Sequence, residues 1–135
     1  VRTLRPETQD MMERLIAQVA QNTAAAHDAE AVVKYVRGYP PTVNHAAETE
    51  RAALAAGRVL GHERVLRDRP PVMGGEDFSF MLLERPGCFV KLGQLGKDGR
   101  GGVPLHNPKY DFNDEMLPVG ASFFAALVEQ ELPRP

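Results

Sequence analysis

A break in regular structure follows the first helix and strand that we predict in this chain. Gly38 and the adjacent prolines Pro40 and Pro41 lie in one short stretch. Proline fixes φ and has no amide donor, so a helix or an interior strand cannot continue through such a pair. We therefore predict a boundary between two structural units at this point.

The hydrophobic pattern predicts helices alternating with short strands. Apolar residues recur at three- and four-residue steps from Met12 to Ala26, which is typical of an amphipathic helix. We expect Asn44 to cap the second helix and Gly61 to end it, and we expect its alanine-rich face to pack closely on a sheet. The predicted helices span 6–27, 45–60, 77–84 and 114–131, and the predicted strands span 1–4, 30–36 and 88–92. A flexible, glycine-rich surface loop is expected over 93–102, and the alternation predicts an α/β or α+β fold.

Composition excludes some classes of protein. The 135 residues are 43% hydrophobic and 25% charged, which is typical of a globular domain. A net charge of −2 gives no reason to expect a nucleic acid or a membrane surface as partner, and no apolar run approaches the roughly 20 residues that span a bilayer. The single cysteine, Cys88, excludes an internal disulfide and favours a reducing, cytoplasmic location. Because the chain opens on Val1 and already reads as a strand, we expect it to be a piece of a longer protein.

One histidine, His106, lies between Pro104 and Pro108 in a loop before the last helix. The prolines predict a stiff, non-helical backbone there, which can hold an imidazole at a set angle. Such a histidine could bind zinc, manganese, nickel or cobalt, or act as a general base. A loop histidine that hydrogen-bonds the backbone is the alternative, and the residues alone leave both open.

A second candidate is the stretch Gly74-Gly75-Glu76-Asp77 at the start of the third predicted helix. Two glycines allow a close approach to a ligand or a positive φ, but the two carboxylates could equally cap the helix. It is not a phosphate loop, because the required Lys-Ser/Thr is absent. We read Cys88 as a buried thiol, and Arg37 either as a ligand for a substrate carboxylate or as a surface charge.

Four ordered motifs together resemble one family. They are 37–44 (RGYPPTVN), 73–79 (MGGEDFS), 86–93 (PGCFVKLG), and the pair 105–108 (LHNP) with 110–115 (YDFNDE). They look like the C-terminal part of metal-dependent amidohydrolases: hippurate hydrolases, N-acyl-amino-acid amidohydrolases and auxin-conjugate hydrolases of the aminoacylase–carboxypeptidase group of metallopeptidases. The resemblance covers essentially the whole chain.

The resemblance implies a zinc-peptidase-like α/β catalytic domain with an inserted α+β, ferredoxin-like lid. Residues 1–38 would be the second half of the lid, which often mediates dimerisation, and residues 39–135 the C-terminal part of the catalytic domain. The implied substrate is a small N-acyl amino acid, and the implied cofactor is a divalent metal pair. His106 would be a metal ligand and the only one in this chain, and Gly74, Gly75 and Glu76 would line the substrate side of the cleft. No catalytic residue is expected in the chain itself, which we expect to be inactive alone, to hold no metal firmly and to self-associate.

Two rival interpretations remain open. A non-catalytic interaction module derived from the same family would keep the same motifs. A self-contained small hydrolase that uses His106 with Glu76 or Asp111 is disfavoured, because no nucleophile or second metal ligand accompanies them.

Overall fold

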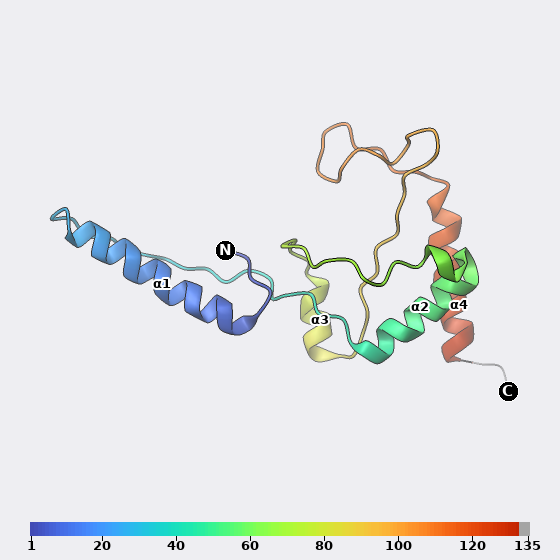
Figure 1. Cartoon of the computed structure of the whole chain (residues 1–135), viewed down its shortest axis with the longest axis horizontal. Coiled ribbons are helices and arrows are strands. Elements are labelled where there is room, and N and C mark those ends of the chain that lie inside the picture. Colours follow the sequence, from blue (N-terminus) through green and yellow to red (C-terminus); the bar gives the residue numbers. More distant parts are fainter. Residues whose placement is uncertain (133–135) are drawn as a thin grey trace. The chain divides into compact units, whose positions relative to one another are not determined.

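The computed structural model describes residues 1–132, and its regular elements are all helices (Figure 1). They are α1 (Pro6–Ala25), α2 (Ala46–Leu60), the short 3-10 helix η1 (His62–Arg64), α3 (Phe78–Glu84) and α4 (Met116–Glu131). The four predicted helices are confirmed, and each end lies within two residues of its predicted position.

Local residues explain where these helices begin and end. Proline stands in the first turn of α1, where its missing amide is not needed. Gly61 follows the last residue of α2 with a φ of 92°, a conformation that glycine adopts without strain. The N-cap position of α2 is occupied by His45, so the prediction that Asn44 takes it was wrong by one residue.

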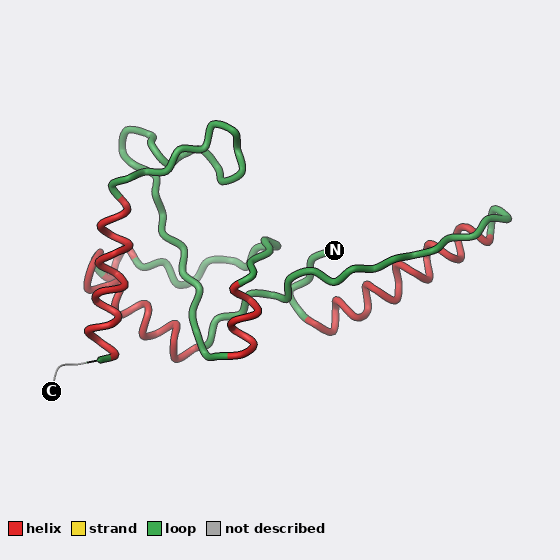
Figure 2. Tube along the Cα trace, turned by 180° about the vertical axis from the view of Figure 1, so that it is seen from behind, coloured by secondary structure: helices red, strands yellow, loops and turns green. Residues whose placement is uncertain are grey.

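The predicted strands over 1–4, 30–36 and 88–92 are wrong for this structure. Figure 2 shows only helices and loops over residues 1–132, and no described residue is assigned to a strand. A β-strand exists through its hydrogen-bond ladder to a neighbouring strand, and none of these segments has such a neighbour among the described residues. The sequence pattern favoured an extended backbone, but pattern alone does not supply the partner.

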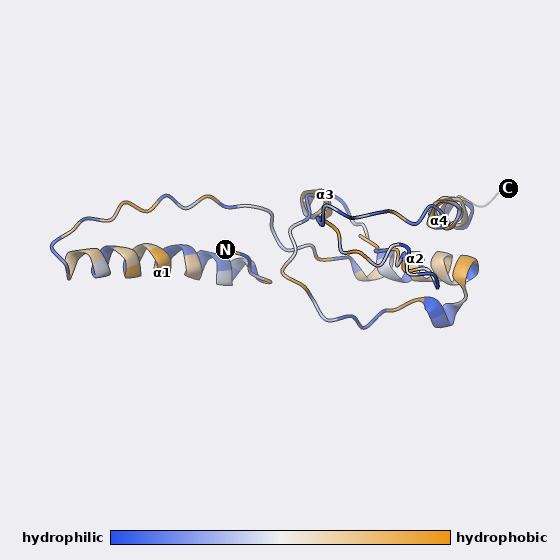
Figure 3. Ribbon diagram, turned by 90° about the horizontal axis from the view of Figure 1, so that it is seen from above, coloured by the Kyte–Doolittle hydropathy of each residue, from blue (hydrophilic) through white to orange (hydrophobic). Residues whose placement is uncertain are grey.

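The segment 30–36 shows this clearly. It runs back beside α1 (Figures 1 and 3), and its side chains alternate between half-buried and exposed as the two-residue period of a strand predicts. Lys34 belongs to the exposed set of side chains, as expected for a face that contacts solvent. Val32 and Val36 belong to the same set and are 90% and 75% exposed. The segment therefore has the side-chain pattern of a strand without its ladder.

The chain forms two compact units. One unit contains Val1–Asn44 and Pro70–Gly87, with α1 and α3. The other contains His45–Arg69 and the chain from Cys88 on, with α2, η1 and α4. The predicted domain boundary after residue 38 stays a prediction.

In the second unit, α2 packs on α4. Small side chains of the two helices are buried: Ala55 is fully buried, and Ala52 and Ala126 are 6% and 8% exposed. The side-chain amide of Gln130 also donates to the carbonyl oxygen of Arg51 at 3.1 Å. The alanine-rich face of α2 was expected to lie on a sheet, and its partner in this structure is a helix.

No helix in the described part of the chain combines the length and apolar character needed to cross a bilayer.

Candidate functional site

His106 occupies a tight turn. The amide of Asn107 donates to the carbonyl oxygen of Pro104 at 3.2 Å, and His106 has a φ of 73°. A positive φ at the third residue is the mark of a type II turn. This conformation is uncommon for a residue with a side chain, although histidine is among those that adopt it more often.

A second turn follows directly. The side-chain oxygen of Asn107 accepts from the amide of Lys109 at 2.8 Å, and its carbonyl oxygen accepts from the amide of Tyr110 at 2.9 Å. Pro108 occupies the second position of this turn, where its fixed φ is favoured. The predicted non-helical backbone around His106 is therefore confirmed, as two consecutive turns.

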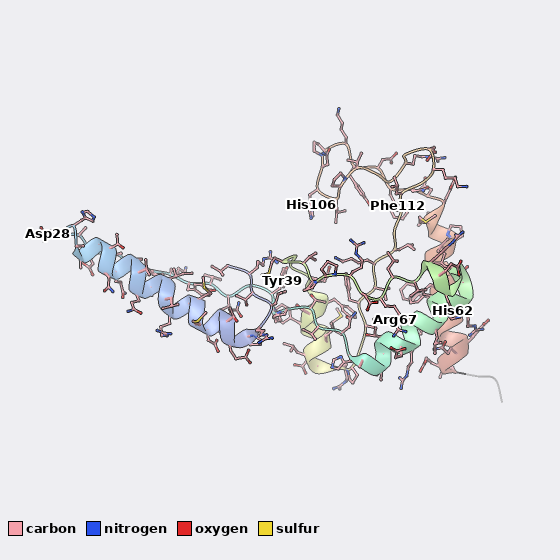
Figure 4. The ribbon with its side chains drawn as sticks, viewed as in Figure 1. Asp28, Tyr39, His62, Arg67, His106 and Phe112 are labelled. Carbon is pink, nitrogen blue, oxygen red and sulfur yellow. The ribbon has the colours of Figure 1, made fainter. Side chains whose placement is uncertain are left out.

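The imidazole of His106 is exposed on this loop, which precedes Phe112 and α4 (Figure 4). No group of three histidine, cysteine, aspartate or glutamate side chains close enough to hold a metal ion occurs within residues 1–132. A hydrolytic metal site needs about three protein ligands. The described residues thus fit one ligand of such a site and not the complete site, and the metal role of His106 stays a prediction.

The Gly74-Gly75-Glu76 stretch lies in the other compact unit. Neither glycine adopts a positive φ, but a Cβ on Gly75 would overlap the guanidinium of Arg2. One oxygen of the half-buried Glu76 carboxylate accepts from the amide of Phe78 at 3.4 Å, and the Glu76 carbonyl oxygen accepts from the Ser79 hydroxyl at 2.5 Å. A group does approach Gly75 closely, as predicted, and this group is the guanidinium of Arg2 from the same unit. Glu76 serves the start of α3, as the capping alternative proposed.

Arg37 is held by two carboxylates of α1. Its guanidinium donates to Glu13 through Nε at 2.8 Å and lies 2.7 Å from Asp10. The hydrogen bond to Glu13, followed by that to Asp10, raises the pKa of Arg37 above its ordinary value. The arrangement ties the segment after 30–36 to α1. It also supports the surface-charge interpretation over contact with a substrate carboxylate.

The structure adds a polar cluster that the sequence interpretation missed, formed by Gln94, Tyr110 and Asn113. The side-chain nitrogen of Gln94 donates to the Tyr110 hydroxyl at 3.0 Å, and its side-chain oxygen accepts from the backbone amide of Asn113 at 3.3 Å. Asn113, which is 1% exposed, donates its side-chain nitrogen to the Gln94 carbonyl oxygen at 3.1 Å. Asn113 lies within the family motif 110–115, and an asparagine just before a predicted helix is itself a signal for a helix start.

Asn113 also supports the start of α4. Its side-chain oxygen accepts from the amide of Glu115 at 3.2 Å, and its carbonyl oxygen accepts from the amide of Met116 at 2.9 Å. These bonds satisfy two of the amides that a helix start leaves without partners. The cluster therefore joins the His106 loop to the start of α4.

The glycine-rich stretch 93–102 consists of hydrogen-bonded turns. The amide of Gly96 donates to the carbonyl oxygen of Arg100 at 2.8 Å, and Gly99 and Gly101 have φ values of 87° and 73°. The hydrogen bond from Arg100 to Asp98, with Nε to Oδ2 at 2.6 Å, lowers the pKa of Asp98 below its ordinary value. The predicted surface loop is present and has a defined path.

Comparison with known proteins gives the family. The sequence profile of peptidase family M20/M25/M40 matches residues 6–130. The chain is 32% identical to IAA-amino acid hydrolase ILR1-like 4 of Arabidopsis thaliana over 125 residues, covering 90% of this chain and 28% of that protein. It is 32% identical to N-acetylcysteine deacetylase of Bacillus subtilis (strain 168) over 127 residues, covering 94% and 31%. It is 28% identical to hippurate hydrolase of Campylobacter jejuni over 127 residues, covering 94% and 32%.

The chain spans about three tenths of the length of the curated relatives it matches. The predicted resemblance to amidohydrolases of the metallopeptidase group is confirmed by the profile and by these relatives. The chain belongs to peptidase family M20/M25/M40.

Proposed function

We propose that this chain is the C-terminal part of a metal-dependent amidohydrolase that cleaves the amide bond of small N-acyl amino acids such as hippurate. The family match supports the general reaction class, and the names of the relatives describe hydrolysis or deacylation of amino-acid conjugates. The observation on which the proposal rests most directly is the exposed imidazole of His106, presented on a left-handed turn within the matched region.

His106 is the residue that we assign to the metal. A side chain in a sparsely populated backbone conformation costs about 1–3 kcal/mol, and such positions cluster at active sites and ligand clamps. His106 is exposed to solvent on this turn. A divalent metal pair, when bound, would polarise the amide carbonyl and activate water. Neutral imidazole suits zinc, manganese, nickel and cobalt, so the ligand alone does not select among them.

The other ligands would come from chain outside these 135 residues. A single imidazole binds a divalent ion weakly compared with a site of about three ligands. We therefore propose that the isolated chain neither holds metal firmly nor hydrolyses amides. Assays with hippurate and added Zn²⁺ or Mn²⁺ test this directly, and robust turnover by the isolated chain would refute it.

We also propose the remaining roles that the family resemblance implies. Residues 1–38 would be the second half of the lid, residues 39–135 would belong to the catalytic domain, and Gly74, Gly75 and Glu76 would line the substrate side of the cleft. The exposed valines of the segment 30–36 support self-association into a homo-oligomer, because an unpaired strand-like edge invites pairing with another copy.

A chimera tests the metal role of His106. The matched segment of the Campylobacter hippurate hydrolase is replaced by this chain, and the metal content and hippurate hydrolysis of the purified chimera are measured. We expect His106→Asn to lower both by at least about 100-fold, since even outer-shell changes cost 10–100-fold. His27→Asn is the matched control, because His27 is also an exposed loop histidine. A chimera that keeps its metal and its activity after His106→Asn would contradict the proposal.

A non-catalytic interaction module of the same family is the second candidate. The absence of a three-donor cluster from residues 1–132 favours it, together with the exposed apolar side chains. The chimera separates the two functions: an interaction module would not restore metal binding when joined to the rest of a hydrolase.

A further inference from the structure

Gln94 contacts the chain on both sides of the His106 loop. We propose that Gln94 is the positioning residue of this loop, holding the turn that presents the imidazole. The proposal rests on the proposed function, since it assigns to Gln94 the support of the ligand that His106 is inferred to be. The chain on either side of the two turns at residues 104–110 meets Gln94: Gly101 approaches it closely before the turns, and Tyr110 and Asn113 are hydrogen-bonded to it after them.

On the C-terminal side of the loop, the contacts are hydrogen bonds. The Gln94 side chain donates to the Tyr110 hydroxyl at 3.0 Å and accepts from the Asn113 amide at 3.3 Å. The Gln94 carbonyl oxygen accepts from the side chain of Asn113 at 3.1 Å. Because Asn113 is 1% exposed and also serves the start of α4, the anchor is fixed to a helix and not to another loop.

On the N-terminal side, the contact is steric. A Cβ added to Gly101 would overlap the Gln94 carbonyl oxygen, and Gly101 has a φ of 73°. Only glycine meets both conditions without strain. A Cβ on Gly102 would lie 3.1 Å from the side chain of Leu95, so the next residue also fits closely. The chain thus enters the His106 loop across the backbone of Gln94.

The two contacts have one consequence for the imidazole. Closing a loop at a single anchor removes conformers that a free loop would sample. A ligand must be held within about 0.5 Å of its productive position, which requires support from surrounding residues. The exposed loop has no buried side chain of its own between Pro104 and Lys109. Beyond the hydrogen bonds of its own two turns, the support of the loop comes from outside it, and Gln94 is the residue that contacts the chain on both sides.

The experiment compares substitutions at Gln94 in the whole chain. Gln94→Met keeps the shape and removes the side-chain hydrogen bonds. Gln94→Glu keeps the oxygen that accepts from the Asn113 amide, and it replaces the donor to Tyr110 by an oxygen that can accept from the Tyr110 hydroxyl. NMR signals of the histidine rings are recorded without metal, and the His106 signal is identified by its loss in His106→Asn. Hydrogen exchange is measured at the amides of Asn107 and Tyr110.

For Gln94→Met we expect the His106 ring signal to broaden or shift, and the two amides to exchange at least about 10-fold faster through local opening. The signals of the other three histidines should stay in place, and Gln94→Glu should restore the His106 signal. Gln21→Met, at an exposed glutamine of α1, is the matched control and should change none of these. Tyr110→Phe removes only one hydroxyl and should give a smaller change in the same direction, which keeps the test open if Gln94→Met folds poorly.

Two results would overturn the proposal. One is a His106 signal and exchange rates unchanged in both Gln94→Met and Tyr110→Phe. The other is an equal change at all four histidines, which would make Gln94 a general folding residue. The proposed function is tested separately, because the ring signal and the exchange rates are measured without metal. It fails if His106→Asn leaves metal binding by the chimera intact.

Discussion

Replacing Ala55 by leucine tests the packing of α2 on α4. Ala55 is fully buried, with 0% of its surface accessible to solvent, and it lies in α2, the helix that packs on α4. Leucine adds three carbon atoms to a position that has no free space. Either the two helices separate or the new side chain takes a strained rotamer, and both weaken the contact.

The magnitude follows from the burial. Overpacking a tight core costs about 1–3 kcal/mol of unfolding free energy. Ala47→Leu is the matched control, because Ala47 is an exposed residue of the same helix. There the change should stay within about 0.5 kcal/mol, as for surface substitutions in general. The two variants differ in position alone, so the difference between them measures the packing at Ala55.

Urea unfolding followed by circular dichroism measures both variants, with hydrogen exchange of the α2 and α4 amides as the local readout. We expect the midpoint of Ala55→Leu to fall with little change in the denaturant slope, and the α2 and α4 amides to exchange faster. If Ala55→Leu and Ala47→Leu shift the midpoint equally, the reasoning is wrong and α2 does not pack on α4 through Ala55.

Four further predictions follow from single features of the chain. Asn113→Ala should lower the unfolding free energy by about 2 kcal/mol, since it removes two buried hydrogen bonds of about 1 kcal/mol each, and a urea midpoint like that of the unchanged chain would contradict this. His106→Val should lower thermal stability by about 1 kcal/mol because of its positive φ, whereas His106→Gly should change it by less than about half of that. The pKa of Asp98 is lowered, so its pairing with Arg100 stabilises the loop fully at a pH above the ordinary pKa of 3.8. This stabilisation is lost as the pH falls through the lowered pKa. An NMR titration should therefore place the midpoint of Asp98 below pH 3.8. Light scattering at high concentration should show self-association that Val32→Lys reduces, and a monomer throughout would count against the unpaired edge.

The helices of this chain and the non-helical loop around His106 could be predicted from local sequence. The apolar period from Met12 to Ala26, the glycine after α2 and the prolines around His106 each act within a few residues, and each lies where the pattern placed it. The family could also be recognised, because its motifs are short segments whose order is preserved. These features depend on φ preferences and on the helical period, which the residues carry with them.

The segment 30–36 shows what local pattern could not decide. Its side chains alternate as in a strand, yet a ladder needs a second strand, and none pairs with it among the described residues. The same holds for the alanine-rich face of α2, whose composition predicted close packing but not that the partner would be α4. The cluster of Gln94, Tyr110 and Asn113 joins residues 16 and 19 positions apart, and no period or motif indicates such a contact.

Neighbouring residues and their order therefore account for the helices, for the non-helical loop around His106 and for the membership in peptidase family M20/M25/M40. Folding of the whole chain accounts for the buried alanines of α2, for the extended segments without a ladder in the described chain, and for the anchoring of the His106 loop by Gln94. Those outcomes depend on contacts between distant residues, whose free energy exists only once the chain has folded.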